Sequence, residues 1–302
     1  MRIGFTLPQF APLAHQADQV ARFAQQVEEQ IGADSLWVGD RLLSPVNPTV
    51  GYGGGSTIPA QFNAILDPFS LLTVAATVTE RVELGTNVLN APWYPPALLA
   101  RSLTTIDVLS AGRLLLGFGV GWSPEEYEAA NVPMNERGAR LDECLDALAA
   151  LWTTEPAEYQ GKHWTVPATR AELKPVRKSG PPIYLAGFAP AAQRRIARRA
   201  DGWLPVHRPG SGTFDPDRAI TAPLAALRRL AEENGRDPNE LRTVLRVYPV
   251  EGAGVEECAE TLRLAGQATE ADHAFVDLQC IAENVDHALT LAQRILDGSR
   301  LR

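Results

Sequence analysis

Three glycines at alternate positions, Gly117, Gly119 and Gly121, end a short apolar run and are the clearest sign of a ligand site in this sequence. Glycine weakens a strand, so glycines at a strand end usually mark the close approach of a ligand or of another stretch of backbone. In parallel α/β proteins, ligands bind beyond the carboxyl ends of the strands. The run that begins at Ala111 therefore predicts a buried strand whose end contacts a bound molecule. The alternative is a glycine-rich turn that serves only local packing.

The spacing of these glycines argues against a dinucleotide-binding fold. They read G-x-G-x-G, whereas the dinucleotide fingerprint reads G-x-G-x-x-G and opens the first strand–helix unit. Here the pattern stands in mid-chain, after several strand and helix signals. Rossmann-type binding is therefore not the favoured prediction.

Polar residues and glycines also follow the other predicted strands, at Gln9, Asp40, Arg41, Asn87, Asn90, Gly187 and His207. Each has an ordinary structural explanation when taken alone, because aspartate and asparagine often cap helices and turns. The segment after Gly187 opens a predicted helix, and the free N–H groups at a helix start suit a phosphate. Together, at the ends of successive strands, these residues predict a large cavity lined by polar groups and glycine.

The elements that must position these residues alternate between strand and helix along the chain. Besides the glycine-ended run, strands are predicted at 2–8, 35–39, 82–89, 183–186, 202–205, 243–250 and 274–279. Eight strand–helix units in about 300 residues favour a single TIM (β/α)8 barrel domain over residues 1–302, with insertions after strands 2 and 4. Residues 42–66 form a long loop of the kind that often serves as a lid, and residues 153–180 are predicted to be irregular.

Composition excludes several classes of function. The net charge of −8 argues against nucleic acid or an anionic membrane as the main partner. No apolar run is long enough to span a bilayer, and the N-terminus reads as a first strand rather than a signal peptide, so a cytoplasmic location is expected. The three cysteines and five histidines lack the spacing of metal ligands, and no metal site is predicted.

Four segments in the same order resemble the bacterial luciferase-like monooxygenase superfamily. They are Ser-Leu-Trp-Val-Gly-Asp at 35–40, Val-Glu-Leu-Gly-Thr-Asn-Val-Leu at 82–89, the glycine-ended segment 109–122, and Ala-Asp-Gly-Trp-Leu-Pro at 200–205. The resemblance is collinear over residues 1–210 and is looser beyond. It is nearest to the branch of oxidoreductases that use the deazaflavin coenzyme F420.

The resemblance implies where a cofactor would lie. A bulge in the third strand, with a non-proline cis peptide matching Asn87–Val88, would back the central ring of a flavin or deazaflavin. Asp40 would lie near that ring, and the loop at Gly187 and Phe188 would hold the cofactor phosphate. The remaining positions implied to contact the cofactor are Asn90, Gly119, Val120, Gly121 and Trp122.

Two positions depart from the pattern of that branch. Its members usually carry histidine after the aspartate, where this chain has Arg41, and some carry a carboxylate where it has Trp122. Arginine stays protonated, so it is a poor general acid or base but a good clamp for an anionic substrate. The proton donor is left open among His207, Tyr94 and Glu126, and His207 could equally be a surface loop residue.

The implied reaction is hydride transfer between F420 and an unidentified small organic substrate. One alternative is an FMN-dependent monooxygenase that uses oxygen and receives reduced flavin from a separate reductase. Another is a barrel that has lost its chemistry and only binds a cofactor. Basic residues at the rim, such as Arg194 or Arg208, would favour a groove for the polyglutamate tail of F420. Relatives often form dimers, so a homodimer is expected.

Overall fold

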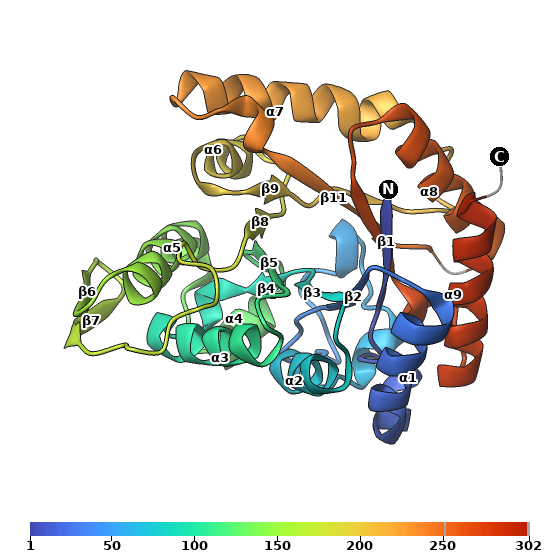
Figure 1. The fold of residues 1–302 in the computed structure, drawn as a ribbon, viewed down its shortest axis with the longest axis horizontal. Helices are drawn as coiled ribbons and strands as arrows, with labels where there is room; N and C mark the ends of the chain where they lie inside the picture. Colours follow the sequence, from blue (N-terminus) through green and yellow to red (C-terminus); the bar gives the residue numbers. More distant parts are fainter. Residues whose placement is uncertain (251, 301–302) are drawn as a thin grey trace.

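The computed structural model describes residues 1–250 and 252–300 of the chain. Eight parallel strand positions form a closed barrel surrounded by helices (Figure 1), which confirms the predicted TIM barrel. The barrel strands are β1 (Arg2–Thr6), β2 (Ser35–Val38), β3 (Glu83–Thr86) with its continuation β4 (Leu89–Asn90), β5 (Leu114–Gly119), β8 (Ile183–Leu185), β9 (Gly202–Trp203) with its continuation β10 (Val206–His207), β11 (Arg242–Val247) and β12 (His273–Val276).

The barrel closes through pairing on both sides of its last two strands. Strand β12 pairs with β1 on one side and with β11 on the other, and β11 pairs with both β9 and β10. Two of the eight positions are each split into two short strands, at β3–β4 and at β9–β10. Both splits lie toward the carboxyl end of the barrel, where the predicted site residues are found.

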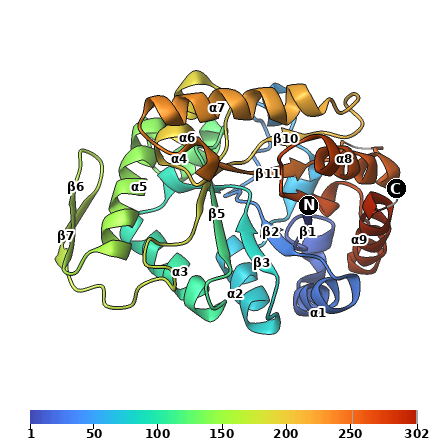
Figure 2. The ribbon, with the colours of Figure 1, turned by 45° about the horizontal axis from the view of Figure 1, so that its top comes forward.

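Helices cover the outside of the barrel (Figure 2). They are α1 (Val20–Gln26), α2 (Pro68–Val78), α3 (Pro96–Leu109), α5 (Arg137–Thr153), α6 (Pro190–Arg199), α7 (Ala222–Glu233), α8 (Val255–Ala268) and α9 (Val285–Arg300). Helix α2 has the usual start of a helix: Pro68 is its first residue, and Asp67 Oδ1 accepts a hydrogen bond of 2.7 Å from Ser70 N.

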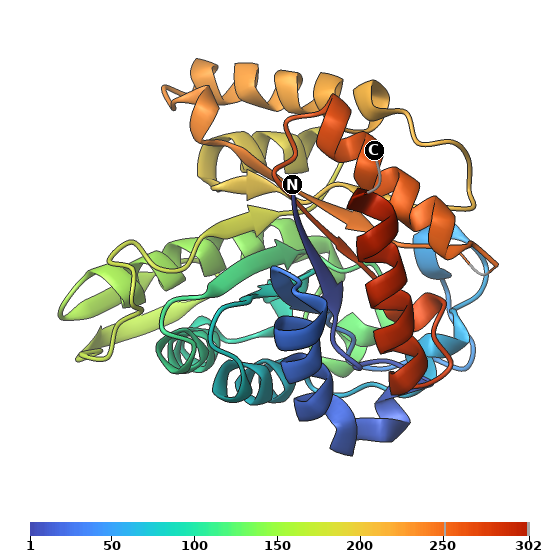
Figure 3. The same ribbon diagram turned by 45° about the vertical axis from the view of Figure 1, so that its right-hand side comes forward.

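Both predicted insertions are present. Residues 39–67 after β2 are irregular apart from two short 3-10 turns, at Tyr52–Gly54 and Ala60–Asn63. After β5, the short helix α4 (Pro124–Ala129) precedes α5, and an antiparallel hairpin of β6 (Ala157–Gln160) and β7 (Thr165–Thr169) lies between α5 and β8. This hairpin projects beside α5 (Figure 3) in the stretch predicted to be irregular.

The interior of the barrel is filled in its middle and lower parts. A middle layer of buried apolar side chains comes from five strands and the link after β9: Trp37, Leu115, Tyr184, Leu204, Val244 and Phe275. Trp37 stacks on Phe275 with ring centroids 4.3 Å apart. The interior is therefore a packed core at this level, as in other barrels of this type.

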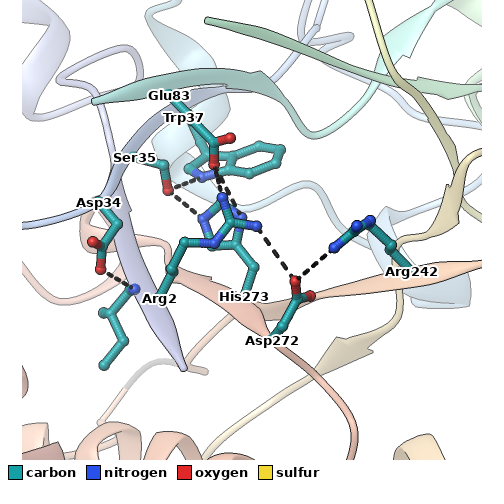
Figure 4. A network of polar contacts seen from close by, with 9 residues as sticks. Arg2, Asp34, Ser35, Trp37, Glu83, Arg242, Asp272 and His273 are labelled. Carbon is teal, nitrogen blue, oxygen red and sulfur yellow. Dashed lines mark hydrogen bonds and ion pairs between the residues drawn. The ribbon is translucent and has the colours of Figure 1, made fainter. Parts of the chain in front are cut away.

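Below this layer, a polar network fills the amino-terminal end of the barrel (Figure 4). Ser35 Oγ lies 2.7 Å from His273 Nε2 and accepts a hydrogen bond of 2.7 Å from Trp37 Nε1. Arg2 is paired with Glu83 and, over 3.5 Å, with Asp272. Burial lowers the pKa of His273 to about 3, so its ring is neutral at ordinary pH.

None of the helices in residues 1–250 and 252–300 is long and apolar enough to cross a membrane. In the same part of the chain, no three histidine, cysteine, aspartate or glutamate side chains gather closely enough to hold a metal ion.

Candidate active site

The register of the strands decides which side chains reach the upper interior of the barrel. Residues that pair across two parallel strands point to the same face of the sheet. Successive residues along one strand point to opposite faces. Val206 pairs with Arg246, whose side chain reaches across the interior, while His207 pairs with Val247, which lies in the outer core. Val206 therefore faces the cavity end of the barrel and His207 faces the helices.

His207 is thus not brought together with the other predicted site residues. Its ring packs edge-on against Phe214, with centroids 4.8 Å apart, and burial lowers its pKa. Its surroundings include Glu257 and Thr261 of α8, which are on the outside of the barrel. The alternation of faces along this segment agrees with that placement, because Leu204 lies in the interior layer and Val206, two residues on, also faces inward. Its place after a strand end alone did not tell which face His207 takes.

Asn87 lies at the break between β3 and β4. The bond from Asn87 to Val88 is cis, as the family resemblance implies. The Asn87 side chain is buried, and neither its Oδ1 nor its Nδ2 has a hydrogen-bond partner among the described residues. Buried amides are nearly always paired, so this carboxamide retains one donor group and one acceptor group for a bound molecule.

The glycines that end β5 make room for this break. A Cβ atom on Gly117 would overlap with the Thr86 carbonyl oxygen, and one on Gly119 would overlap with Val88 Cγ2. Thr86 Oγ1 also bonds Gly117 twice, donating to its carbonyl and accepting from its N–H, each over 2.8 Å. The close approach predicted from the glycines is therefore made, at these two positions, by the neighbouring strand rather than directly by a ligand.

Asp40 links the end of β2 to the segment after β3. Its Oδ2 accepts a hydrogen bond of 2.8 Å from Asn90 N, and its Oδ1 accepts one of 3.0 Å from the Tyr94 hydroxyl. The Asn90 side chain in turn donates to the Asp40 carbonyl over 3.0 Å. Burial raises the pKa of Asp40 to about 7, against the lowering effect of these two donors. Burial and the nearby Asp40 also raise the pKa of Tyr94.

Arg41 is held between two aromatic rings. Its guanidinium carbon lies 4.4 Å from the ring centroid of Trp122 and 5.1 Å from that of Phe62. Its Nε is 3.1 Å from Glu126 Oε1, and its Nη2 donates to the Leu43 carbonyl over 3.0 Å. Aromatic rings therefore lie near the guanidinium of Arg41, whose Nη1 is buried without a hydrogen-bond partner among the described residues.

Glu126, one of the predicted proton donors, is engaged in the same place. Its Oε1 also accepts hydrogen bonds from the backbone N–H groups of Leu42, at 2.7 Å, and Leu43, at 3.3 Å. The pair of Arg41 and Glu126 thus fixes the start of the loop that follows β2. Glu126 thus accepts two backbone hydrogen bonds and forms an ion pair with Arg41, and these contacts together position that loop.

The loop of residues 42–66, called the lid from here on, crosses the mouth of the barrel. The ring of Tyr52 lies 5.1 Å from Phe62 within the lid, 5.6 Å from Trp122 after β5, and 5.6 Å from Tyr248 after β11. The lid also bonds to the start of α4, where Thr49 N donates to Glu125 Oε1 over 2.6 Å. Tyr52 therefore connects opposite sides of the upper barrel.

A charged network on the last two strands was missed by the sequence analysis. Arg246 donates from Nε to Asp277 Oδ2 over 2.6 Å, from Nη2 to Asp277 Oδ1 over 3.1 Å, and from Nη1 to the Asn87 carbonyl over 3.3 Å. Gln279 donates to Asp277 over 2.7 Å and accepts from Thr6 over 2.8 Å. The signal was an isolated arginine inside an apolar strand, Thr-Val-Leu-Arg-Val.

The remaining predicted positions line two sides of the mouth. Gly121 has a φ of +64° and lies against the Asn90 side chain, while the Val120 carbonyl accepts a hydrogen bond from Tyr127. Gly187, with a φ of +136°, and the exposed Phe188 precede helix α6. These two residues form the open turn at a helix start that suits a phosphate.

A closed parallel barrel with polar groups gathered beyond its carboxyl strand ends is the architecture of α/β-barrel enzymes, whose active sites lie at that end. The chain belongs to the luciferase-like monooxygenase family, whose model matches residues 1–296. Members of this family are oxidoreductases, including monooxygenases.

Three known proteins illustrate this likeness. An uncharacterised protein of Mycobacterium tuberculosis, Rv0940c, is 34% identical over 272 residues, which cover 85% of this chain and 91% of that protein. The monooxygenase RslO1 from Streptomyces bottropensis superposes with a TM-score of 0.74 at 19% identity, covering 98% of both chains. An F420-dependent secondary alcohol dehydrogenase, solved with an F420-acetone adduct, superposes with a TM-score of 0.72 at 16% identity, covering 99% of both chains.

Proposed function

We propose that this protein transfers a hydride between coenzyme F420 and a small organic substrate. The observation that carries the proposal is the buried Asn87 side chain, whose donor and acceptor groups have no partner in the described part of the chain. The pyrimidine edge of a deazaflavin presents an N–H between two carbonyl groups, and a carboxamide complements such an edge. The likeness to the F420-dependent alcohol dehydrogenase supports this choice of cofactor.

The residues around Asn87 fit a flat ring. Val88 offers a half-buried apolar surface at the strand break, and the missing side chain at Gly119 lets Val88 sit there. Asn90 comes after Val88 and lies in β4, and its backbone N–H donates a hydrogen bond to Asp40 at the end of β2. The turn at Gly187 would hold the cofactor phosphate at the start of α6. When bound, the deazaflavin supplies the carbon atom that accepts or donates the hydride.

The protein must also hold a proton, because interconversion of an alcohol and a ketone moves a hydride from carbon and a proton from oxygen. Among the three donors considered from the sequence, His207 faces outward and Glu126 is occupied by Arg41 and the lid. Tyr94 remains, hydrogen-bonded to Asp40. A carboxyl group with a pKa of about 7 can take up or release a proton near neutral pH, so we assign this task to Asp40 with Tyr94.

FMN is the competing cofactor, because flavin and deazaflavin share the pyrimidine edge that Asn87 would read. The fold likeness to RslO1, a monooxygenase, supports a monooxygenase reaction as the second candidate. In that case the protein would use reduced flavin and oxygen rather than transfer a hydride to or from the organic substrate.

Titration of the purified protein with F420 and with FMN, each oxidised and reduced, separates the candidates. Calorimetry and cofactor fluorescence are the readouts. We expect micromolar binding of F420 and binding of FMN at least about tenfold weaker, a difference of about 1.4 kcal/mol. Tighter binding of FMN than of F420 would instead favour an oxygen-dependent monooxygenase. Binding of neither would overturn the proposal and favour a barrel that has lost this chemistry.

A further inference from the structure

Arginine and tyrosine side chains alternate across the mouth of the barrel. The guanidinium carbon of Arg246 lies 4.7 Å from the ring centroid of Tyr248, and that of Arg208 lies 5.4 Å from the same ring. Arg208 also lies 5.8 Å from the ring of Tyr52 in the lid. We call these four residues the arginine–tyrosine stack.

The two arginines of the stack differ in their charge partners. Arg246 is bound by both carboxylate oxygens of Asp277. Arg208 has no carboxylate within ion-pair distance among residues 1–250 and 252–300, and its buried Nε has no hydrogen-bond partner there. At the mouth of the same barrel, Arg41 is paired with Glu126. Arg208 is therefore the cation of this region that the described carboxylates leave unbalanced.

The lid passes close over the Arg208 guanidinium. Gly53 has a φ of +65°, and a Cβ atom built on it would lie 3.1 Å from Arg208 Nη1. A side chain at position 53 would press on that nitrogen. Glycine at this position therefore keeps the lid from pressing on the guanidinium, and Arg208 itself is half-buried.

We infer that Arg208 is a binding site for a carboxylate group, with the rings of Tyr52 and Tyr248 beside it. A guanidinium presents two parallel N–H donors that match the two oxygens of a carboxylate, and partial burial strengthens such a pair. The inference rests on the proposed function, because it adds an anion subsite at the mouth above the cavity where the cofactor and substrate would meet. Flat carboxylates suit it best, since tyrosine rings can cover a flat group.

Two molecules could supply this carboxylate. One is the organic substrate, and the other is the glutamyl tail of coenzyme F420. The chemistry at Arg208 is the same in both cases, and only the carrier of the carboxylate differs. The experiment therefore needs one arm for each source.

The first arm uses benzoate as the probe and benzamide as its uncharged match, with no cofactor present. Binding is followed by calorimetry and by tryptophan fluorescence, because Trp122 touches Tyr52. We expect saturable binding of benzoate, no comparable binding of benzamide, and a loss of about tenfold or more in Arg208→Gln. Arg208→Lys keeps the positive charge but lacks the two parallel N–H donors. Its affinity for benzoate should lie between those of wild type and Arg208→Gln. Arg101→Gln, an exposed arginine on α3, is the control for net charge.

The second arm compares F420 with a deazaflavin that lacks the glutamyl tail, in wild type and Arg208→Gln. A loss confined to F420 assigns the carboxylate to the tail, and a loss confined to benzoate assigns it to the substrate. If Arg208→Gln is still folded by circular dichroism and binds both benzoate and F420 as wild type does, the inference is overturned. The arginine–tyrosine stack would then only hold the lid in place. Failure of wild-type protein to bind F420 would instead count against the proposed function, and the benzoate arm does not depend on it.

Discussion

The hydroxyl of Tyr94 donates a hydrogen bond of 3.0 Å to the carboxyl group of Asp40, and this contact joins the end of β2 to the segment after β4. Asp40 is buried, and its pKa is raised to about 7, chiefly by burial. The pair therefore changes its charge in the neutral range, where an ordinary aspartate is fully ionised.

The first prediction concerns stability and pH. Asp40 has an ordinary pKa near 3.8 when the chain is unfolded and a higher one when it is folded, so between these values the folded state binds the extra proton. Its contribution to the free energy of unfolding is complete below about pH 4 and is lost as pH rises through about 7. Asp40→Asn should remove this slope. Urea unfolding of wild type and Asp40→Asn at pH 5, 6, 7 and 8 measures the pH dependence of the free energy of unfolding. The same pH dependence in both proteins would contradict the raised pKa of Asp40.

The second prediction concerns Asn87. Replacement by leucine removes an amide that has no partner in the described structure, so the ligand-free protein should be as stable as wild type or more stable. Cofactor affinity should fall by about tenfold or more, because a buried hydrogen bond contributes about 1 to 3 kcal/mol when its partner is left unpaired. Thermal unfolding of Asn87→Leu measures the change in stability, and calorimetric titration measures the change in cofactor affinity. A less stable protein with unchanged affinity would mean that the amide is purely structural.

The third prediction tests the packing between Gly119 and Val88. Gly119→Ala places a methyl group where Val88 Cγ2 lies, and overpacking of this kind costs about 1 to 3 kcal/mol. Val88→Ala in the same chain should recover much of the loss, because it removes the overlapping methyl. A double-mutant cycle of unfolding free energies measures the coupling, with Val88→Ala alone as the reference. Simple additivity would show that the two side chains do not share this space.

The fourth prediction concerns the lid. Tyr52→Ala removes the ring that contacts Trp122 and Tyr248, so acrylamide should quench tryptophan fluorescence more strongly than in wild type. Val46→Ala is the matched control, because Val46 lies in the same loop with 93% of its surface exposed. Equal quenching of the two variants would argue against Tyr52 as the closing contact.

Strand and helix periodicity was sufficient to predict the barrel and both insertions, because each strand–helix unit carries its own hydrophobic pattern and caps. Asp67 followed by Pro68 is an example, since the bond that starts α2 is local in sequence. The hairpin at 157–169 was missed because its strands are short and largely exposed, so they lack the apolar signal of a core strand.

The site was harder to predict because its residues lie far apart in the sequence. They come together only through the pairing register of the strands. His207 points outward because Leu204 and Val206 take the inward face of this segment, and a position just after a strand end does not by itself tell the two faces apart. Arg41 stays a predicted anion clamp, and the rings of Phe62 and Trp122 over its guanidinium were not foreseen, since Trp122 comes from a segment far along the chain. Arg246 and Asp277 pair across two adjacent strands, a contact visible only once the barrel is closed.

The stack of Trp37 on Phe275, with the polar network beneath it, has a consequence for the order of events in catalysis. Those side chains fill the lower barrel, so among the described residues a molecule reaches Asn87 from the lid side. A molecule held against Asn87 would then lie beneath its reaction partner, and it would have to bind first and leave last. Two-substrate kinetics should then follow an ordered scheme, with the molecule that covers Asn87 binding ahead of its reaction partner.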